Sequence, residues 1–465
     1  MVNRERYKRL IRFVNSAVIL LTFTAFFAYI WYDRYAYTEA MKEPFFRKGN
    51  YVVVGMYTLM VYFFFKLYGG FKVGYLRMFD VLYSQVLSVI CANAVVYLQL
   101  CLIGHWKFGS FAGPMIELTV VELFFSVAWL FFSRWAYMKL FPPRDLLLIY
   151  GRYSPDDLRH KVSARPDKYA IRESVCYDDV APERLEEMIL RYPGVIVTDV
   201  PAQFRNKILK LCFSHDIRCY MVPKISDIMI QSADEIHLFD TPLLLFRNKG
   251  LSVEQAFIKR SFDILVSLTL LIVTAPIMLL IAIAIKVYDR GPVFFTQERL
   301  TKDGRIFTIY KFRSMRVRPQ DDEYCMTRKN DERLTPVGKA IRKVHVDELP
   351  QLLNILKGDM SIVGPRPESP RLAEEYTRFM PEFAFRLKVK AGLTGYAQVY
   401  GKYNTTPYDK LKLDLAYIER YSLVLDLKLL LMTVKVLFQR ENTEGIDAGK
   451  KSAATKDNLE KTGAK

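Results

Sequence analysis

Four long apolar segments fill the first 140 residues, at roughly 11–32, 51–68, 79–104 and 113–138. Each is close to the ~20 residues that an α-helix needs to cross a bilayer. The leader before them carries five cations, Arg4, Arg6, Lys8, Arg9 and Arg12. Such a leader predicts a cytoplasmic N-terminus, and an even number of spans returns the chain to that side, although the basic loop at 33–50 opposes this topology. The pattern predicts a four-helix transmembrane region over residues 1–143.

Two carboxylates lie in or near the fourth apolar segment, Glu117 and Glu122. A carboxylate inside a membrane is costly and is often functional. A transport role is one interpretation of the pair. Packing against another span, or exposure to lipid headgroups, is the interpretation that we favour.

Residues 144–250 change to short apolar runs separated by helical stretches. The runs Leu146–Tyr150, Val195–Thr198 and Ile217–Met221 are typical of buried strands. Alternation of strand and helix predicts a small Rossmann-like α/β domain with a parallel sheet. The first run ends at Gly151-Arg152-Tyr153, without the glycine-rich loop that a dinucleotide needs. A ligand site stays open, and a scaffold or interaction role is favoured.

A fifth apolar run, Phe262 to Val287, is interrupted by Pro276. Cations flank it on both sides, at Lys259, Arg260, Lys286 and Arg290. Positive charge at both ends predicts that both ends stay in the cytoplasm. Pro276 removes a backbone donor and clashes with the carbonyl of Ile272, so we expect the helix to kink, with the break of the re-entrant helix at Thr274-Ala275-Pro276. The segment is therefore expected to be a re-entrant helix over 262–287; a complete, kinked fifth span is the alternative.

Composition agrees with a membrane protein. The 465 residues are 51% hydrophobic, yet 67 Lys and Arg against 49 Asp and Glu give a net charge of +18. A basic surface on an apolar chain suits anionic headgroups and phosphorylated ligands, and no recognition motif supports nucleic-acid binding. The six Cys form no CxxC pair and there are five His, which argues against zinc and against a disulfide framework.

The densest polar motifs lie between residues 251 and 440. Asp347 and Glu348 stand at the start of a short amphipathic helix, where Asp347 is expected to be the N-cap and Pro350 lies in the first turn. Free backbone N–H groups and the helix dipole favour an ionised carboxylate at such a position. Adjacent carboxylates beside cations suit phosphoryl chemistry, in which one attacks phosphorus and the other holds a metal ion.

Several cations surround this pair in the sequence. Lys311 and Arg313 are two residues apart on a predicted strand and therefore share a face. Arg342 lies near the end of a helix that Thr335-Pro336 is expected to start, and Arg366 lies between two prolines. Arg and Lys at such a site would bind phosphate oxygens.

Residues 256–440 resemble the monotopic phosphoglycosyl transferases of the bacterial sugar transferase family. Three motifs carry the resemblance: Asp-Glu-Leu-Pro-Gln-Leu from Asp347, Gly-Pro-Arg-Pro from Gly364 and Lys-Phe-Arg-Ser-Met from Lys311. With four spans and an α/β domain, the chain resembles their long form, the polyprenyl glycosylphosphotransferases. The implied fold has four transmembrane helices (1–143), a Rossmann-like domain (144–250), a monotopic α/β catalytic domain with the re-entrant helix (251–440) and a disordered polar tail (441–465).

The resemblance implies transfer of a sugar 1-phosphate from a UDP-sugar to undecaprenyl phosphate, the first step of exopolysaccharide, capsule or O-antigen synthesis, at the inner membrane of a bacterium. It makes Asp347 the nucleophile that forms an aspartyl phosphosugar and releases UMP, with Glu348 binding Mg²⁺. It also implies a set of substrate-binding residues: Lys311, Arg313, Arg342, Arg366, Gln398, Lys402 and Asp414. The sequence does not reveal which sugar is transferred; glucose or galactose is expected from family frequency, and a homodimer stays open.

Four positions depart from the family pattern. Ala275 replaces the usual Ser before the proline, Lys402 the usual Arg, and Tyr396 and Tyr400 the common Trp and Asn. Segments 408–421 and 425–440 are expected to be amphipathic interface helices, with ordinary core helices as the alternative. A membrane-bound nucleotide-sugar dehydratase is a competing function, since Tyr408 and Lys412 have its Tyr-xxx-Lys spacing, but its glycine-rich loop is absent. A non-enzymatic scaffold or regulator is the second competing function.

Overall fold

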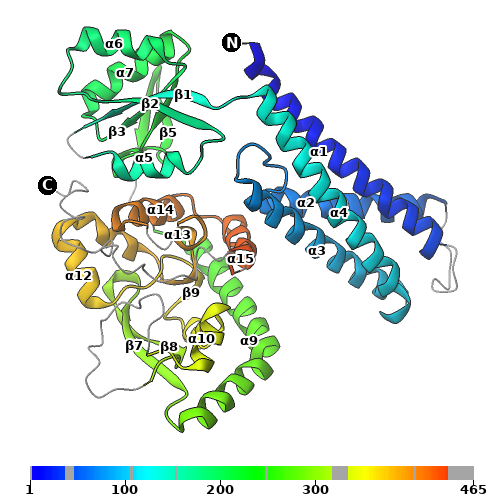
Figure 1. Cartoon of the computed structure of the whole chain (residues 1–465). Helices are drawn as coiled ribbons and strands as arrows, with labels where there is room; N and C mark the ends of the chain where they lie inside the picture. Colours follow the sequence, from blue (N-terminus) through cyan, green and yellow to red (C-terminus); the bar gives the residue numbers. More distant parts are fainter. Residues whose placement is uncertain are drawn as a thin grey trace. The chain divides into compact units, whose positions relative to one another are not determined.

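The computed structural model describes residues 3–36, 47–104, 106, 108–151, 154–246, 250–316, 333–401 and 405–437. The chain forms two compact units, Met1–Val222 and Pro223–Lys465 (Figure 1). This division lies before the domain boundary expected at residue 250. Helix α8 (Ile225–Ile230) lies with the second unit, since its Ile228 joins that unit's core and Ser232 Oγ donates to Glu419 at 3.0 Å.

The first unit contains the expected apolar helices. They are α1 (Asn3–Ile30), extended by a π-helical turn η1 (Trp31–Tyr35), α2 (Arg47–Tyr68), α3 (Met78–Ile103) and α4 (Phe108–Leu140). All four are long and apolar enough to cross a membrane. Aromatic side chains fill the space between them, and the rings of Phe27 and Tyr57 stack at 4.1 Å. Large apolar side chains such as Leu21 and Phe124 remain exposed, as on a surface that contacts lipid.

The two carboxylates of α4 have different surroundings. Glu122 is fully buried, and it accepts hydrogen bonds from the Tyr57 hydroxyl and from Asn93 Nδ2, the latter at 2.8 Å. These bonds join α2, α3 and α4, which supports a packing role for Glu122. Glu117 is exposed on the surface of the helix, so the two residues do not form one site.

A parallel four-stranded sheet completes the first unit, in the order β2-β1-β3-β4. Its strands are β1 (Arg144–Tyr150), β2 (Tyr169–Cys176), β3 (Gly194–Thr198) and β4 (Arg218–Met221), and its helices are α5 (Asp156–Ser163), α6 (Pro182–Arg191) and α7 (Ala202–Ser214). The three strands predicted from apolar runs are confirmed. Strand β2 was not predicted, because polar residues such as Arg172 and Glu173 interrupt it. At the end of β1, a Cβ on Gly151 would lie 1.9 Å from the carbonyl oxygen of Asp199, so this glycine permits close backbone approach.

The second unit begins with α8, the hairpin of β5 (Asp234–Leu238) and β6 (Thr241–Leu245), and α9 (Val253–Asp289). A second hairpin follows, of β7 (Phe294–Leu300), a 3₁₀ turn η2 (Lys302–Gly304) and β8 (Ile306–Phe312). The next elements are α10 (Pro336–Lys343), η3 (Val346–Glu348), α11 (Gln351–Lys357), β9 (Ser361–Val363), α12 (Pro370–Phe379) and η4 (Pro381–Lys388). The last are β10 (Gly392–Thr394), parallel to β9, then α13 (Tyr396–Tyr400), α14 (Pro407–Glu419) and α15 (Leu423–Leu437).

Helix α9 is longer than the segment expected over 262–287, and it stays helical through Thr274, Ala275 and Pro276. The expected kink therefore lies within a continuous helix, and Figure 1 shows α9 changing direction part-way along. Proline removes one backbone bond and bends a helix without ending it when the neighbouring turns hold. Thr274 Oγ1 donates to the carbonyl of Leu270 at 2.7 Å, inside this region.

Both halves of α9 pack against the same unit. Near its start, Lys259 is buried and donates to the carbonyl of Val363 at 3.0 Å. Near its end, Ile285 is buried in a cluster with Phe312 and Ile341. A straight helix of this length would be about 55 Å long, more than a bilayer's hydrocarbon core.

The two C-terminal helices differ from each other. Leu411, Leu415 and Tyr417 of α14 are fully buried in the core, so α14 is a core helix and the expected interface helix is not found there. Helix α15 buries Leu429 but leaves Val424 and Leu427 exposed, which keeps one apolar face outside the core. The expected disordered tail, 441–465, lies outside the described residues.

Candidate active site

Asp347 and Glu348 lie in η3, a single 3₁₀ turn between α10 and α11. Helix α10 begins as expected, since the Thr335 hydroxyl accepts from the N–H of Gly338 at 2.9 Å. His345 has a left-handed backbone (φ +57°) that reverses the chain before η3. Asp347 is not the N-cap of α11; Pro350 occupies that position. The chain first closes the 3₁₀ turn, with Leu349 N–H donating to Val346 at 3.3 Å, and this shifts the helix start.

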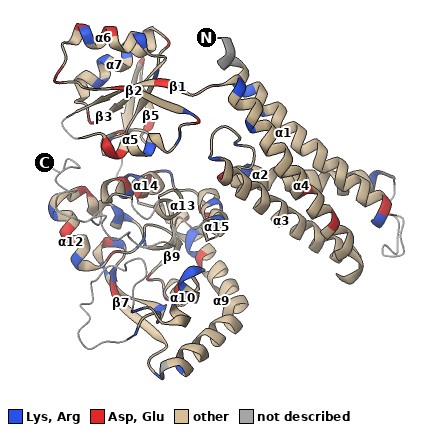
Figure 2. Ribbon diagram, viewed as in Figure 1, with Lys and Arg blue, Asp and Glu red and all other residues tan. Residues whose placement is uncertain are grey.

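Glu348 is held between two cations from different parts of the unit. Its Oε1 accepts from Lys311 Nζ of β8 at 2.8 Å and from Arg366 Nη2 at 2.8 Å. Burial would raise the pKa of Glu348, but the charges of Arg366 and Lys311 outweigh it and hold the pKa well below its usual range. Glu348 therefore stays ionised. In the ribbon of Figure 2, charged residues are marked at many positions of the second unit, whereas most of α9 carries none.

Asp347 is mostly buried, with 9% of its surface exposed. Burial and then the neighbouring charge of Glu348 raise the pKa of Asp347, while Lys311, Arg342 and His345 lower it in part. Among the residues that the structure describes, no hydrogen bond is made to its carboxylate. A desolvated, unbonded carboxylate beside cations is available to act as a nucleophile.

Arg366 follows β9 through Gly364 and Pro365. A Cβ on Gly364 would lie 2.4 Å from the carbonyl oxygen of Lys390, so only glycine allows this approach. The carbonyl of Arg366 accepts from Arg386 Nη2 at 2.9 Å. The Arg366 side chain is 42% exposed, so its guanidinium can bind both Glu348 and a solvent-borne anion.

The other expected substrate-binding residues have separate surroundings. Arg313 is buried and lies close to Gly291. A Cβ added to this glycine would be 2.2 Å from Nη1 of Arg313. Gln398 Nε2 donates to the carbonyl of Leu393 at 2.9 Å, and its Oε1 is buried without a partner among the described residues. Asp414 is buried and pairs with Arg386 Nε at 2.6 Å. Lys402 lies outside the described residues. The structure thus brings Asp347, Glu348, Lys311, Arg342 and Arg366 together, a group that we call the Asp347 site.

A second charged group lies next to it, which we call the Arg386 cluster: Glu368, Arg386, Lys410 and Asp414. Arg386 pairs with Asp414 and, at 3.6 Å, with Glu368, which also pairs with Lys410. Burial would raise the pKa of Glu368, but Lys410 and Arg386 lower it to about 2. Arg386 and Glu368 are not among the residues expected from the sequence. Glu368 directly follows the Arg366 motif, which is a usable signal, whereas Arg386 lies among aromatic residues with no motif around it.

The Asp347 site can accommodate a magnesium ion. Among the described residues no group of three or more His, Cys, Asp or Glu could hold a metal by itself. Magnesium, however, keeps several waters and commonly binds one or two carboxylates plus substrate phosphates. Both cations contact Glu348 through Oε1, so Oε2 and the adjacent Asp347 carboxylate fit that role.

The family model described as bacterial sugar transferase matches residues 254–440. An N-acetylgalactosaminephosphotransferase acting on undecaprenyl phosphate, from Aeromonas hydrophila, is 33% identical over 304 residues, which are 63% of this chain and 67% of that protein. A UDP-glucose:undecaprenyl-phosphate glucose-1-phosphate transferase from Klebsiella pneumoniae is 37% identical over 52% of this chain and 51% of its own length. An undecaprenyl-phosphate galactose phosphotransferase from Salmonella typhimurium is 34% identical over 48% of this chain. The chain spans about half the length of the last two relatives.

Proposed function

The chain belongs to the bacterial sugar transferase family, and we propose that it transfers a sugar 1-phosphate from a UDP-sugar to undecaprenyl phosphate. The relatives whose names state this reaction support the proposal. The observation that carries it is the Asp347 site: a carboxylate that accepts no hydrogen bond from the described residues, beside a glutamate held by Lys311 and Arg366. The product would start a polysaccharide at the cytoplasmic face of a bacterial inner membrane.

In the first step, an oxygen of Asp347 attacks the phosphorus that carries the sugar. The bond from that phosphorus to the bridging oxygen breaks, and UMP leaves with the electron pair. Lys311 and Arg366 move from Glu348 to the phosphate oxygens, because an entering dianion offers stronger charge-assisted bonds. Arg342 adds positive charge beside Asp347. The enzyme then carries an aspartyl phosphosugar.

In the second step, an oxygen of undecaprenyl phosphate attacks the same phosphorus. The acyl phosphate bond to Asp347 breaks, the carboxylate is regenerated, and the sugar leaves on a lipid diphosphate. Each substrate thus reacts with a different form of the enzyme, which predicts ping-pong kinetics.

Magnesium would be held by Glu348, through Oε2, together with substrate phosphates, and it would supply charge neutralisation for the pyrophosphate. Glu348 has a second function that needs no metal. It keeps Lys311 and Arg366 paired until a phosphate arrives, which avoids leaving two partly buried cations unpaired.

Helix α9 supports a lipid acceptor, because most of its large apolar side chains are exposed and both halves contact the same unit. We propose that α9 enters and leaves the bilayer on the cytoplasmic side. Single cysteines near Lys259 and Arg290 should then both react with a membrane-impermeant thiol reagent only from the cytoplasm. Pro276→Leu should straighten α9 and expose part of the catalytic unit outside. Labelling of the two wild-type sites from opposite faces would contradict this topology.

The function is tested with purified membranes, undecaprenyl phosphate and a panel of UDP-sugars that includes glucose, galactose and N-acetylgalactosamine. Release of UMP with at least one sugar, and transfer of labelled sugar phosphate to lipid, are expected. Asp347→Asn is the control that should release none. NAD-dependent dehydration would support the dehydratase, and no reaction with any sugar would support a scaffold.

A further inference from the structure

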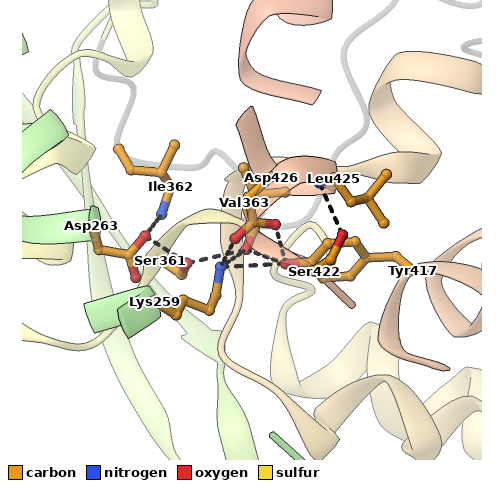
Figure 3. Close-up of polar contacts among 9 residues, drawn as sticks. All are labelled: Lys259, Asp263, Ser361, Ile362, Val363, Tyr417, Ser422, Leu425 and Asp426. Carbon is orange, nitrogen blue, oxygen red and sulfur yellow. Dashed lines mark hydrogen bonds and ion pairs between the residues drawn. The ribbon is translucent and has the colours of Figure 1, made fainter. Parts of the chain in front are cut away.

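The beginning of α9 contacts two of the chain segments that hold the Asp347 site in place. The first of these segments is β9, which leads through Gly364 and Pro365 to Arg366. The Asp263 carboxylate accepts the backbone N–H of Ile362 at 3.0 Å and the Ser361 hydroxyl at 2.9 Å (Figure 3). Asp263 is 2% exposed, so both bonds are shielded from water and strong.

Lys259, one turn before Asp263 in α9, also contacts β9. Its Nζ donates to the carbonyl of Val363 at 3.0 Å and pairs with Asp426 of α15 at 2.7 Å. The Tyr417 hydroxyl lies 2.8 Å from Asp426 and 3.1 Å from the Val363 oxygen, which closes the network (Figure 3). The Lys259 and Asp426 side chains are 7% and 0% exposed. A buried ion pair of this kind stabilises a fold little compared with apolar residues, so positioning is a reason to retain it.

The second segment is α11, which begins three residues after Glu348. Arg260 Nη1 donates to the carbonyl of Ile355 at 2.6 Å, and Nη2 donates to Leu356 at 2.8 Å. These are carbonyls of the last turn of α11, and that of Ile355 also accepts the N–H of the C-cap residue Gly358 at 3.0 Å. The guanidinium thus binds the negative end of the helix dipole.

We propose that Lys259, Arg260 and Asp263 are positioning residues that mount the Glu348 segment and the Arg366 segment on one short stretch of the membrane helix. We call these three residues the α9 mount. The inference rests on the proposed function, since it assigns the α9 mount to the reaction through Arg366. It also links the membrane to the chemistry, because the helix proposed to lie in the bilayer holds both of these segments.

The first experiment measures the mount without using activity. Amide hydrogen exchange of the peptide that contains Ile362 should be faster in Asp263→Ala than in wild type, by about 10-fold or more, because a buried bond is lost. Asp263→Asn keeps an acceptor oxygen and should restore most of the protection. Asp227→Ala is the matched control: it removes a carboxylate that accepts a backbone N–H, from Lys224 at 2.8 Å, elsewhere in the unit. Unchanged exchange at Ile362 in Asp263→Ala would overturn the mount.

The second experiment asks whether Asp263 acts through Arg366. UMP release is measured for Asp263→Ala in the wild-type and in the Arg366→Ala backgrounds. We expect about a 10-fold loss of kcat/KM in the wild-type background and less than about 2-fold in the other, because coupled residues are non-additive. Asp263→Asn should recover activity and Asp227→Ala should keep it.

If Asp263 has only a structural role, Asp263→Ala will lower kcat/KM by the same factor in both backgrounds. That result would overturn the inference. If Asp263→Ala does not fold, the same comparison is made with Asp263→Asn. Its smaller loss of kcat/KM must again disappear in the Arg366→Ala background. If the wild-type protein releases no UMP from any sugar, the proposed function fails, while the exchange experiment still decides whether the mount exists.

Discussion

The Asp347 site and the Arg386 cluster are both built from carboxylates and cations of the second unit, yet they differ in exposure and in pairing. Arg366 is 42% and Lys311 20% exposed, whereas Arg386 is 4% and Asp414 1% exposed. In the Arg386 cluster both carboxylates have a cation partner; in the Asp347 site, Asp347 accepts no hydrogen bond among the described residues. An incompletely paired carboxylate can react, while a cluster whose carboxylates are all paired with cations is suited to holding chain segments together.

The largest expected effect is on activity at the Asp347 site. Asp347→Asn should lower turnover by about 1,000-fold or more, because the amide is a poor nucleophile. The melting temperature should not fall: burial raises the pKa of Asp347, so its charge opposes folding above that pKa, and Asn removes the charge. UMP release and thermal melting in detergent measure both. Covalent sugar phosphate on the variant would show that Asp347 is not the nucleophile.

The corresponding change in the Arg386 cluster should act on stability. Arg386→Met leaves Glu368 and Asp414 buried without their partner, which should cost about 3–5 kcal/mol. The double variant Arg386→Met/Asp414→Leu should recover part of that loss, since fewer charges remain unpaired. Denaturation in detergent measures both. If Arg386→Met stays as stable as wild type but loses UDP-sugar binding, the cluster belongs to the substrate site, as first expected for Asp414.

Acid should also separate the two groups. The pKa of Glu368 is about 2 when folded, against ~4.3 for Glu in an unfolded chain. The folded state binds the proton less well, so this stabilisation, on the order of 3 kcal/mol, is present above ~pH 4.3 and is lost as the pH falls towards 2. In Glu368→Gln, the free energy of unfolding should depend less on pH in that window. A dependence as steep as that of wild type would mean that Glu368 does not cause it.

Glu348→Gln tests the other carboxylate of the Asp347 site. Turnover should fall by about 100-fold, and more Mg²⁺ should be needed for half-maximal activity. The control is Glu374→Gln, which breaks an exposed pair with Arg378 at 2.7 Å and should change neither quantity. An unchanged magnesium titration in Glu348→Gln would remove Glu348 from the metal site.

The smallest effect should come from that exposed pair itself. Arg378→Ala should change the free energy of unfolding by less than about 1 kcal/mol, because solvent screens the interaction. Chemical denaturation against wild type measures it. A loss as large as that of Arg386→Met would mean that exposure does not distinguish the clusters.

Local pattern determined much of this protein. The four apolar helices, three of the parallel strands and the start of α10 at Thr335 follow from hydrophobic periodicity and capping, which act within a few residues. The pair Asp347-Glu348 and the cations Lys311 and Arg366 were also visible, because each lies in a distinct motif. The kink expected at Pro276 lies within a continuous helix, and neighbouring turns decide whether a proline ends or bends a helix.

Tertiary structure alone decided which charges serve chemistry and which serve the fold. Asp414 and Glu348 are both acidic residues in sequence, but packing places the first under Arg386 and the second between two partly exposed cations. Arg386, Lys259 and Asp426 have no motif, and their partners lie 28, 104 and 167 residues away along the chain. Sequence sets the type of each charge, and burial, which depends on contacts between distant segments, sets whether that charge is paired and what it can do.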